Sequence, residues 1–185
     1  RRVLFRSMFS PVFASARRRA LWLGVNLATC FLASTVISQF ERVIEQIVAL
    51  AILMPIVASM GGIAGSQTLT ITVRGMALGQ IGKANARALL RKELAVGLLN
   101  GLIWSVVVML AVIAWFKDRE LGIIMGVAMI TNLLVAALAG VIIPLIQKRV
   151  GIDPAIAGGV VLTTVTDVIG FLTFLGLAKI GRAHV

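Results

Sequence analysis

The stretch PIVASMGGIAGSQTLTITVRGMALGQI (residues 55–81) decides how the rest of the chain is interpreted. It is as apolar as a membrane helix, and it follows the wholly apolar run IVALAIL (residues 47–53). It also carries a proline, paired glycines and a row of hydroxyl and amide side chains, none of which a stable helix needs. The composition of the whole chain must therefore decide whether this stretch lies in water or in a lipid bilayer.

The composition is that of an integral membrane protein. The 185 residues are 59% hydrophobic and only 14% charged, with a mean hydropathy of +1.04. Soluble domains have about a quarter charged residues, and a globule of this size cannot hide so much apolar surface. We therefore expect the lipid bilayer to be its main partner. Cys30 is the single cysteine, so the chain can form no internal disulfide.

The two ends of the chain have sequences that we expect to lie outside the fold. RRVLFRS (residues 1–7) and IGRAHV (residues 180–185) match the two translated strands of a sequencing adapter, so we predict that neither is native. Setting them aside removes His184 and four of the 18 basic residues, which leaves 14 basic against 7 acidic side chains. No basic patch interleaved with aromatic residues accompanies this charge, so we expect no nucleic-acid partner.

Five long stretches almost free of charge predict an all-α protein, an integral membrane bundle of five transmembrane helices. A helix needs about 20 apolar residues to cross a hydrocarbon core of roughly 30 Å. A closed β-barrel would require short strands of alternating polarity, a pattern that the sequence lacks. We expect one transmembrane domain at residues 20–179, with spans at residues 20–40, 47–73, 94–116, 121–147 and 155–178.

Basic residues in the flanks and connections predict the orientation of the bundle. Ten of them lie in the N-terminal flank and in the second and fourth connections, which share one side of a five-span topology. Cytoplasmic segments are enriched in Lys and Arg, so we expect the N-terminus in the cytoplasm. The ten are Arg17, Arg18, Arg19, Arg74, Lys83, Arg87, Arg91, Lys92, Lys148 and Arg149, against Arg42, Lys117, Arg119 and Lys179 on the other side.

The second connection, RGMALGQIGKANARALLRKE (residues 74–93), has two interpretations. It could form a short interfacial helix that feeds the third span. The simpler interpretation, which we favour, is a positively charged cytoplasmic loop. The remaining connections are expected at ERVIEQ (residues 41–46), KDRE (residues 117–120) and KRVGID (residues 148–153).

Asp167 is the sharpest single feature, because it lies near the middle of the fifth span. Inserting a carboxylate at that depth costs about 3 kcal/mol, so such a residue faces a water-filled path or a partner. Helical spacing places Gly159, Thr163, Thr166 and Gly170 on one face with it. The alternative is a buried acid hydrogen-bonded across a helix interface, with Gly and Thr as packing residues. We favour a cation site, because no basic residue lies at comparable depth.

The opening stretch predicts a broken helix beside this acid. Pro55 removes a backbone donor and bends a helix, and Gly61, Gly62 and Gly65 weaken it further or admit another backbone. Carbonyls freed at membrane depth are tolerated only when they are buried or line a cavity. A glycine-rich packing interface with a proline kink explains the stretch equally well. Oxygens are supplied by Ser59, Ser66, Gln67, Thr68, Thr70 and Thr72.

The cation that this chemistry favours is a hard one. Thiolate and imidazole sites for zinc or copper are excluded, because the core holds no histidine and Cys30 stands alone. One acid with neutral oxygens is too sparse to strip a divalent ion, but it fits Mg²⁺ that keeps its water. A proton or Na⁺ would fit as well, and the residues alone do not decide among the three.

Two long motifs resemble the MgtE family of magnesium channels and transporters. They are the opening stretch (residues 55–81) and DPAIAGGVVLTTVTDVIGFLTFLGLA (residues 153–178), which resembles the final membrane helix of that family. The five-span layout with a cytoplasmic N-terminus agrees, and the resemblance covers roughly residues 8–179. It implies a non-enzymatic membrane protein, a homodimer in a bacterial inner membrane that transports Mg²⁺.

The resemblance also implies roles for particular residues. The pore lies between subunits and is lined by the second and fifth helices, and Asp167 recognises hydrated Mg²⁺. Asp153 matches a family acid at the cytoplasmic mouth, and it also fits an N-cap before Pro154. The pore lining implied by the motifs comprises Gly61, Gly62, Gly65, Gln67, Gly159, Thr163 and Gly170.

Two departures from the family pattern bear on function. The family usually has Asn after the paired glycines, where this chain has Ile63, so an amide that could touch the water shell is replaced by hydrocarbon. Family members also carry a cytoplasmic N-terminal domain and paired CBS domains that sense Mg²⁺, and neither is found in this sequence. We expect residues 8–19 to be the tail of the helix that connects those domains to the pore.

Two other functions remain open on the sequence, and a third is disfavoured. A proton- or Na⁺-coupled carrier would use Asp167 as the cycling group, and it would need a coupling gradient where a channel needs none. A non-transporting membrane scaffold would use the acid only for assembly. An intramembrane aspartyl protease needs two facing acids, and only Asp167 lies deep in a span.

Overall fold

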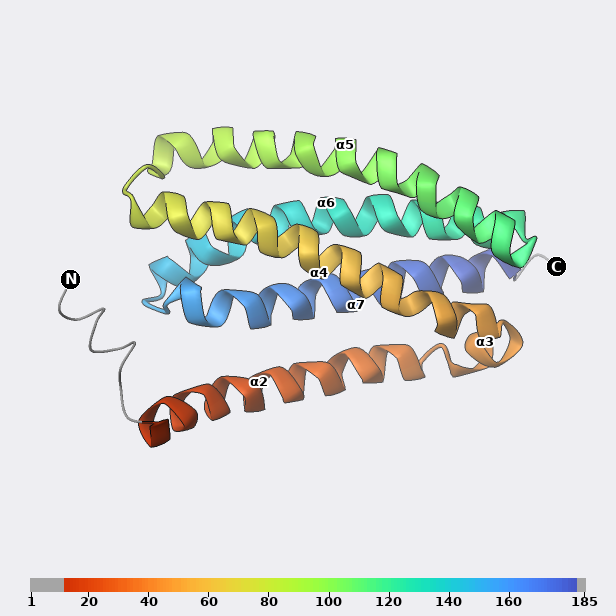
Figure 1. Cartoon of the computed structure of the whole chain (residues 1–185), viewed down its shortest axis with the longest axis horizontal. Helices are drawn as coiled ribbons and strands as arrows, with labels where there is room; N and C mark the ends of the chain where they lie inside the picture. Colours follow the sequence, from red (N-terminus) through yellow and green to blue (C-terminus); the bar gives the residue numbers. More distant parts are fainter. Residues whose placement is uncertain (1–11, 183–185) are drawn as a thin grey trace.

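The computed structural model describes residues 12–182, which form six α-helices joined by short turns (Figure 1). Five of these helices are long and apolar enough to cross a membrane. The prediction of an all-α bundle with five spans is confirmed. Of the stretches that we predict to be adapter sequence, residues 1–7 and 183–185 lie outside the described residues, as do residues 8–11 of the expected connecting tail, whereas residues 180–182 end the last helix. The helices are α2 (Val12–Ser38), α3 (Glu41–Gln46), α4 (Val48–Ala77), α5 (Lys83–Phe116), α6 (Arg119–Arg149) and α7 (Pro154–Arg182).

The connections are shorter than the sequence suggested. Residues 41–46, expected as a plain connection, form the short helix α3. The basic stretch at residues 74–93 is not a loop, so the favoured interpretation is wrong. Its first residues end α4 and α5 begins at Lys83, which leaves a turn of five residues around Gly79 with φ 68°. The Ala, Arg, Leu and Lys that follow Lys83 are strong helix formers, so they extend the third span.

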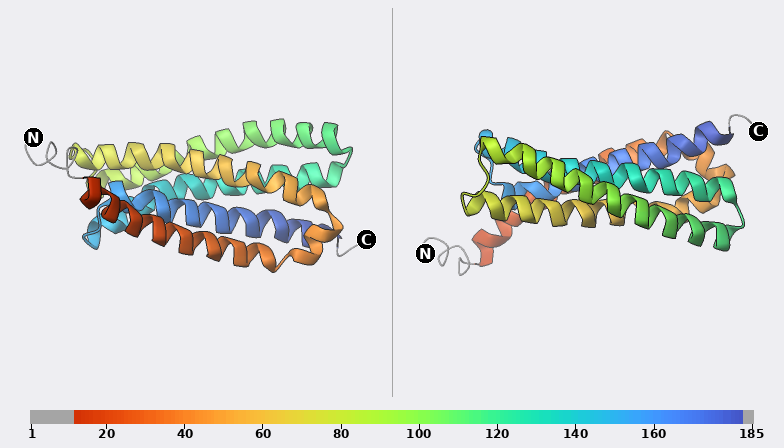
Figure 2. Two further views of the ribbon diagram at one scale, coloured as in Figure 1. Left: turned by 60° about the horizontal axis from the view of Figure 1, so that its bottom comes forward. Right: turned by 90° about the horizontal axis from the view of Figure 1, so that it is seen from above.

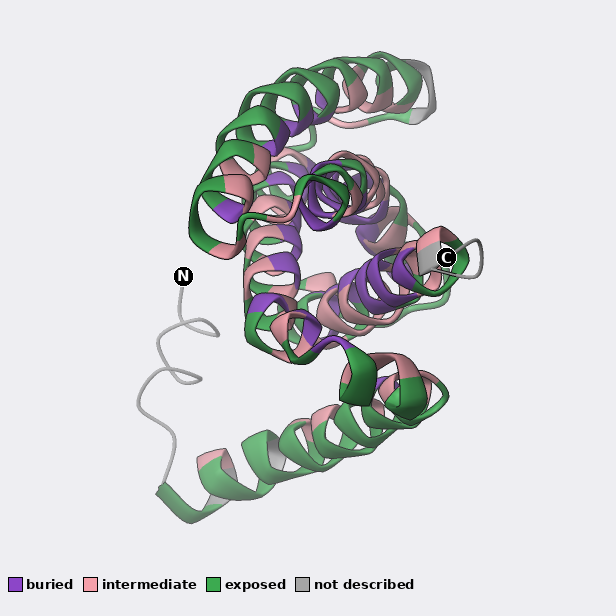
Figure 3. Cartoon of the chain, turned by 90° about the vertical axis from the view of Figure 1, so that its right-hand side faces the viewer, coloured by how far each residue is buried: buried purple, intermediate pink, exposed green. Residues whose placement is uncertain are grey.

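The long helix α6 lies at the centre of the bundle. It packs against α4, α5 and α7, whereas α5 packs almost only on α6 and α2 packs on α7 (Figure 1 and Figure 2). Buried residues gather between α4, α6 and α7, and α2 is almost entirely exposed (Figure 3). Apolar side chains such as Leu21 and Phe31 therefore face outward, as they can in lipid.

Glycines let α6 approach its neighbours closely. A Cβ added at Gly97 on α5 would lie 2.9 Å from the Cβ of Ala137 on α6. A Cβ added at Gly140 on α6 would lie 2.7 Å from Thr68 Cβ and 2.9 Å from the Gly65 carbonyl oxygen, both on α4. Membrane helices associate through such close packing, because lipid offers no hydrophobic force between them. These glycines therefore set the distance between α6 and both neighbours.

The second span is a continuous helix, so the prediction of a broken one is wrong. α4 runs through Pro55 and through Gly61, Gly62 and Gly65 to Ala77. Pro55 still removes one hydrogen bond to the carbonyl four residues earlier, but α4 packs against α6 and α7, and Leu53 and Val57, which flank the proline, are fully buried. Gly61 and Gly65 serve close packing against α6 and α7, and the glycines of this stretch do not unwind the backbone.

The helix ends and turns that carry the charged residues lie at the two ends of the bundle. The start of α2, the α4–α5 turn and the α6–α7 turn lie at one end (Figure 1). The end of α2, the α5–α6 turn and the end of α7 lie at the other. The basic residues counted along the chain are thus segregated in space, as the alternation of five spans predicts. The turn between α6 and α7 is made by Gly151 with φ 76°.

A buried acid joins α5 to α4. Glu93 on α5 is only 4% exposed, and its Oε2 accepts a hydrogen bond of 3.2 Å from the Thr68 hydroxyl on α4. The exposed Nζ of Lys92 lies 3.9 Å from Glu93 Oε1. Since α4 and α5 have few other contacts, this hydrogen bond is their main polar connection among the described residues.

Replacing Thr68 with valine is expected to lower the free energy of unfolding by about 1–3 kcal/mol, because Glu93 would lose its buried donor. Thermal unfolding in detergent should show this as a drop of about 2–4 °C in Tm per kcal/mol. Thr35→Val is the matched control, since the exposed Thr35 hydroxyl bonds only to Phe31 within its own helix. Equal Tm values for the two variants would contradict a role for the Thr68–Glu93 bond.

Candidate functional site

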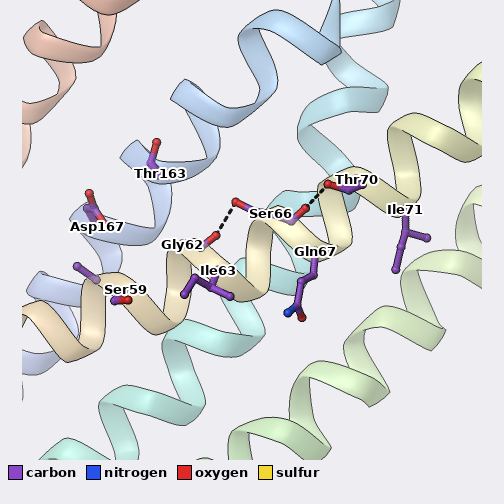
Figure 4. A pocket seen from close by; sticks show the side chains of 10 residues that line it. Ser59, Gly62, Ile63, Ser66, Gln67, Thr70, Ile71, Thr163 and Asp167 are labelled. Atoms are coloured by element: carbon purple, nitrogen blue, oxygen red, sulfur yellow. Dashed lines mark hydrogen bonds between the residues drawn. The ribbon is translucent and has the colours of Figure 1, made fainter.

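An open groove of about 930 Å³ runs along the seam between α4 and α7 (Figure 4). It is the place where the two long motifs of the sequence meet. Asp167 is the one charged residue among the described residues that line it. The lining residues are Ala58, Ser59, Gly62, Ile63, Ser66, Gln67, Thr70 and Ile71 from α4, and Thr163 and Asp167 from α7.

Asp167 is half-buried and lies one helical turn beyond Thr163 on α7. The two side chains project from the same side of the helix (Figure 4). No Lys or Arg within residues 12–182 forms an ion pair with Asp167. A carboxylate at this depth without a cationic side chain is costly. A cation in the groove would supply the missing charge.

Three hydroxyl groups that line the groove donate their protons within their own helices. Ser66 Oγ donates to the Gly62 carbonyl at 2.7 Å, and Thr70 Oγ1 donates to the Ser66 carbonyl at 2.7 Å (Figure 4). Thr163 Oγ1 donates to the Gly159 carbonyl at 2.7 Å. Each hydroxyl thus uses its one proton within its own helix and keeps lone pairs free to accept. The wall of the groove therefore offers oxygens that accept hydrogen bonds.

The predicted lining residues divide into two groups. Gly62, Gln67, Thr163 and Asp167 line the groove, as the sequence suggested. Gly159 is exposed on α7, and a Cβ added there would meet no atom within 4 Å.

Gly61, Gly65 and Gly170 do not line this groove. All three are buried, on the sides of their helices that face the neighbouring helices. A Cβ added at Gly61 or Gly170 would meet the Asn132 side chain on α6, and one at Gly65 would meet Leu162 on α7. The helical period explains this division, because residues three or four apart share a face while their immediate neighbours point elsewhere. Their role within this chain is close packing.

The predicted row of hydroxyls divides in the same way. Thr68 and Thr72 are buried on the far side of α4, where Thr68 bonds to Glu93 and Thr72 bonds to the Thr68 carbonyl. Thr166 is fully buried, so it does not share the exposed stripe of Asp167. The polar stripe of α7 is therefore narrower than the spacing alone suggested.

Asp153 lies at the start of α7 and is exposed. Its Oδ1 accepts a hydrogen bond of 3.0 Å from the Ala155 backbone N–H, and Pro154 occupies the first helical position. This geometry is that of an N-cap, and the capping interpretation is confirmed. Asp153 does not line the groove, and its role at a cytoplasmic mouth remains a prediction.

Sequence reasoning passed over two buried polar residues that bind α4 through their side chains. Asn132 on α6 is fully buried, and its Nδ2 donates to the Val57 carbonyl on α4 at 2.8 Å. Glu93 was counted only as part of a charged loop. A lone asparagine in the middle of an otherwise apolar span was the signal available for the first of these. The second had no signal, because its burial depends on where α4 lies.

Comparison with known proteins identifies the family of this chain. Residues 54–177, which include both the opening stretch and Asp167, match the family model MgtE, described as a divalent cation transporter. Proteins named magnesium transporter MgtE from Bacillus subtilis, Enterococcus faecalis and Thermus thermophilus are 32%, 30% and 31% identical to this chain. The matches cover 91%, 89% and 88% of this chain but only 38%, 36% and 36% of those relatives. The chain thus spans well under half their length, and it belongs to the MgtE family of divalent cation transporters.

Proposed function

We propose that this chain forms the transmembrane pathway of a magnesium transporter. Two copies enclose a channel-like pore, α4 and α7 of each copy line it, and Asp167 recognises Mg²⁺ through the water shell of the ion. The observation that carries the proposal is the α4–α7 groove, whose one charged lining residue among those described is Asp167.

The chemistry of the groove suits an ion that keeps its water. Mg²⁺ dehydrates reluctantly and usually retains several water molecules. The hydrogens of those waters point away from the ion, toward whatever surrounds it. Ser66, Thr70 and Thr163 offer only acceptor sites to the groove, because each has donated its proton to its own helix. Such a wall can bind the outer face of a hydrated cation together with the carboxylate.

A second copy of the chain would close the groove. The groove opens to the outside of the bundle, where the hydrocarbon of a bilayer could not solvate Asp167. Two copies related by a twofold axis would cover each other with the same surface. They would place two carboxylates around one path, which matches the charge of a divalent ion.

The distribution of charge supports an orientation and a location. The end of the bundle that carries the α4–α5 and α6–α7 turns holds most of the basic side chains, so it faces the cytoplasm. The relatives come from bacteria, so the location that we propose is a bacterial inner membrane. The sensing domains of the full-length protein would join the bundle at this cytoplasmic end, before α2.

Mg²⁺ uptake into proteoliposomes tests the proposal. We expect uptake into vesicles with a negative interior, in the absence of any Na⁺ or pH gradient and above the level of protein-free vesicles. Uptake that requires one of those gradients would favour the coupled carrier. Correctly folded and reconstituted protein that passes no Mg²⁺ under any gradient would favour the scaffold.

Replacing Ile63 with asparagine is expected to raise Mg²⁺ uptake about three- to tenfold, because an amide would add a hydrogen bond to the water shell. Ile63 is 57% exposed and lines the groove. The matched control is Ile71→Asn, which places the same amide two turns further along the same wall, at a side chain 49% exposed. An equal increase in both variants would mean that general polarity, and not position, is responsible.

A further inference from the structure

The side chain of Asn132 connects three helices behind the groove. It is fully buried on α6, and its Nδ2 donates to the Val57 carbonyl on α4 at 2.8 Å. A Cβ on Gly61 would collide with this amide, and a Cβ on Gly170 of α7 would lie 2.8 Å from its nitrogen. The absence of side chains at Gly61 and Gly170 therefore makes room between α4 and α7 for the Asn132 side chain of α6.

This contact lies directly behind the seam that forms the groove. Gly62, next to Gly61, faces the groove, and a Cβ added to it would lie 3.9 Å from Thr163 Cγ2 on α7. On α7, Asp167 lines the groove, whereas Gly170 is buried against Asn132. The front of the seam thus carries the residues that we assign to the ion, and the back carries Asn132.

The amide binds α4 just after its proline. Pro55 lies two residues before Val57 and removes one of the hydrogen bonds of this helix. The Oδ1 of Asn132 is buried without a hydrogen-bond partner among the described residues. A half-satisfied amide stabilises a core less than an apolar side chain of similar size. The presence of Asn132 is better explained by the relative positions of the helices that its hydrogen bond specifies, as single buried asparagines specify the register of coiled coils.

We propose that Asn132 is a positioning residue for ion passage, which holds α4 against α7 so that Gly62 and Asp167 face one path. The expected effect of Asn132 on transport rests on the proposed function. Its expected effect on the packing of α4 against α7 rests on geometry alone. It assigns to α6, which does not line the groove, control over the affinity of the site.

The first test compares Asn132→Leu with Met129→Leu, a change of similar size one turn earlier at a side chain only 1% exposed. We expect both to fold. Asn132→Leu should raise the half-saturating Mg²⁺ concentration for uptake about tenfold or more, the size of effect seen when supporting residues of metal sites are removed. Met129→Leu should leave it unchanged. An unchanged half-saturating concentration in Asn132→Leu would overturn the proposal.

The second test reads the seam without using transport. In a Cys30→Ser background, Gly62→Cys with Thr163→Cys places two thiols on facing helices, where a Cβ at residue 62 would lie 3.9 Å from Thr163 Cγ2, and an added thiol oxidant converts them to a disulfide at a rate set by their separation. We expect Asn132→Leu to slow this cross-link several-fold and Met129→Leu to leave it unchanged. If the wild type passes no Mg²⁺, the proposed function fails, and the cross-link alone still decides whether Asn132 positions the seam. A cross-linking rate that does not depend on Asn132 would overturn the positioning role.

A third variant separates position from packing. Gly61→Ala should impair folding, because its Cβ would meet the Asn132 amide, and a second change, Asn132→Ala, should restore folding by making room. We expect the half-saturating Mg²⁺ concentration of the double variant to stay above that of the wild type, as in Asn132→Leu, because the hydrogen bond to the Val57 carbonyl is absent. Full recovery of Mg²⁺ affinity in the double variant would overturn the proposal and leave Asn132 as a packing residue.

Discussion

Asp167→Asn is expected to lower the initial rate of Mg²⁺ uptake at least about 20-fold at subsaturating Mg²⁺. An ion separated from a carboxylate oxygen by one of its own waters lies about 4–5 Å away, from a metal–oxygen distance of about 2 Å and a hydrogen bond of about 2.7 Å. Over about 4.5 Å, a divalent ion and one carboxylate attract each other by about 2 kcal/mol in bulk water and about 7 kcal/mol at a dielectric constant of about 20. The lower value alone corresponds to the 20-fold effect.

Two controls separate loss of charge from loss of structure. Asp167→Glu keeps the charge on the groove wall, and we expect it to retain measurable uptake. Glu120→Gln removes an exposed acid at the far end of the bundle, outside the groove, and should leave uptake at the wild-type rate. If Asp167→Asn reconstitutes normally and transports within twofold of wild type, the assignment of Asp167 to the ion is wrong.

Gly140→Ala is expected to destabilise the bundle by about 1–3 kcal/mol, the usual effect of inserting a methyl group into a packed core. The new Cβ would lie 2.7 Å from Thr68 Cβ and 2.9 Å from the Gly65 carbonyl oxygen. The second of these atoms belongs to the backbone, so no side-chain rotation can relieve the contact. α4 would have to move away from α6, and the front wall of the groove would move with it.

Thermal unfolding in detergent measures the effect of Gly140→Ala, with an expected fall of about 2–4 °C in Tm per kcal/mol. Gly176→Ala is the matched control, because a Cβ there meets no atom within 4 Å and alanine favours a helix by about 1 kcal/mol. We expect the control to be neutral or stabilised. A Gly140→Ala protein as stable as the control would contradict the close approach of α4 and α6.

Some errors of the sequence interpretation share one physical cause. The row of hydroxyls on α4 and the polar stripe on α7 were treated as single faces, but Thr68 and Thr166 point into the bundle while Ser66 and Asp167 do not. A period of 3.6 residues assigns side chains to a face. It does not reveal which face meets another helix when apolar and small residues surround the helix on every side.

The continuity of α4 is a second such case. Pro55 and the neighbouring glycines weaken a helix when it is considered alone, which is why a break was expected. In the bundle, α4 packs against α6 and α7, and Leu53 and Val57, which flank Pro55, are fully buried. Tertiary contacts therefore outweigh local preference, and the glycines become packing positions.

Composition and hydropathy alone determined that the chain is a five-span helical membrane protein, because the length of an apolar run is set by the thickness of a bilayer. They also singled out Asp167, because an acid at that depth is costly wherever it points. Only the tertiary structure decided which of Gly61 and Gly62 faces the groove, and that Asn132 and Glu93 are buried against α4. These outcomes depend on how closely α6 approaches its neighbours, and that distance arises from contacts between residues far apart in the chain.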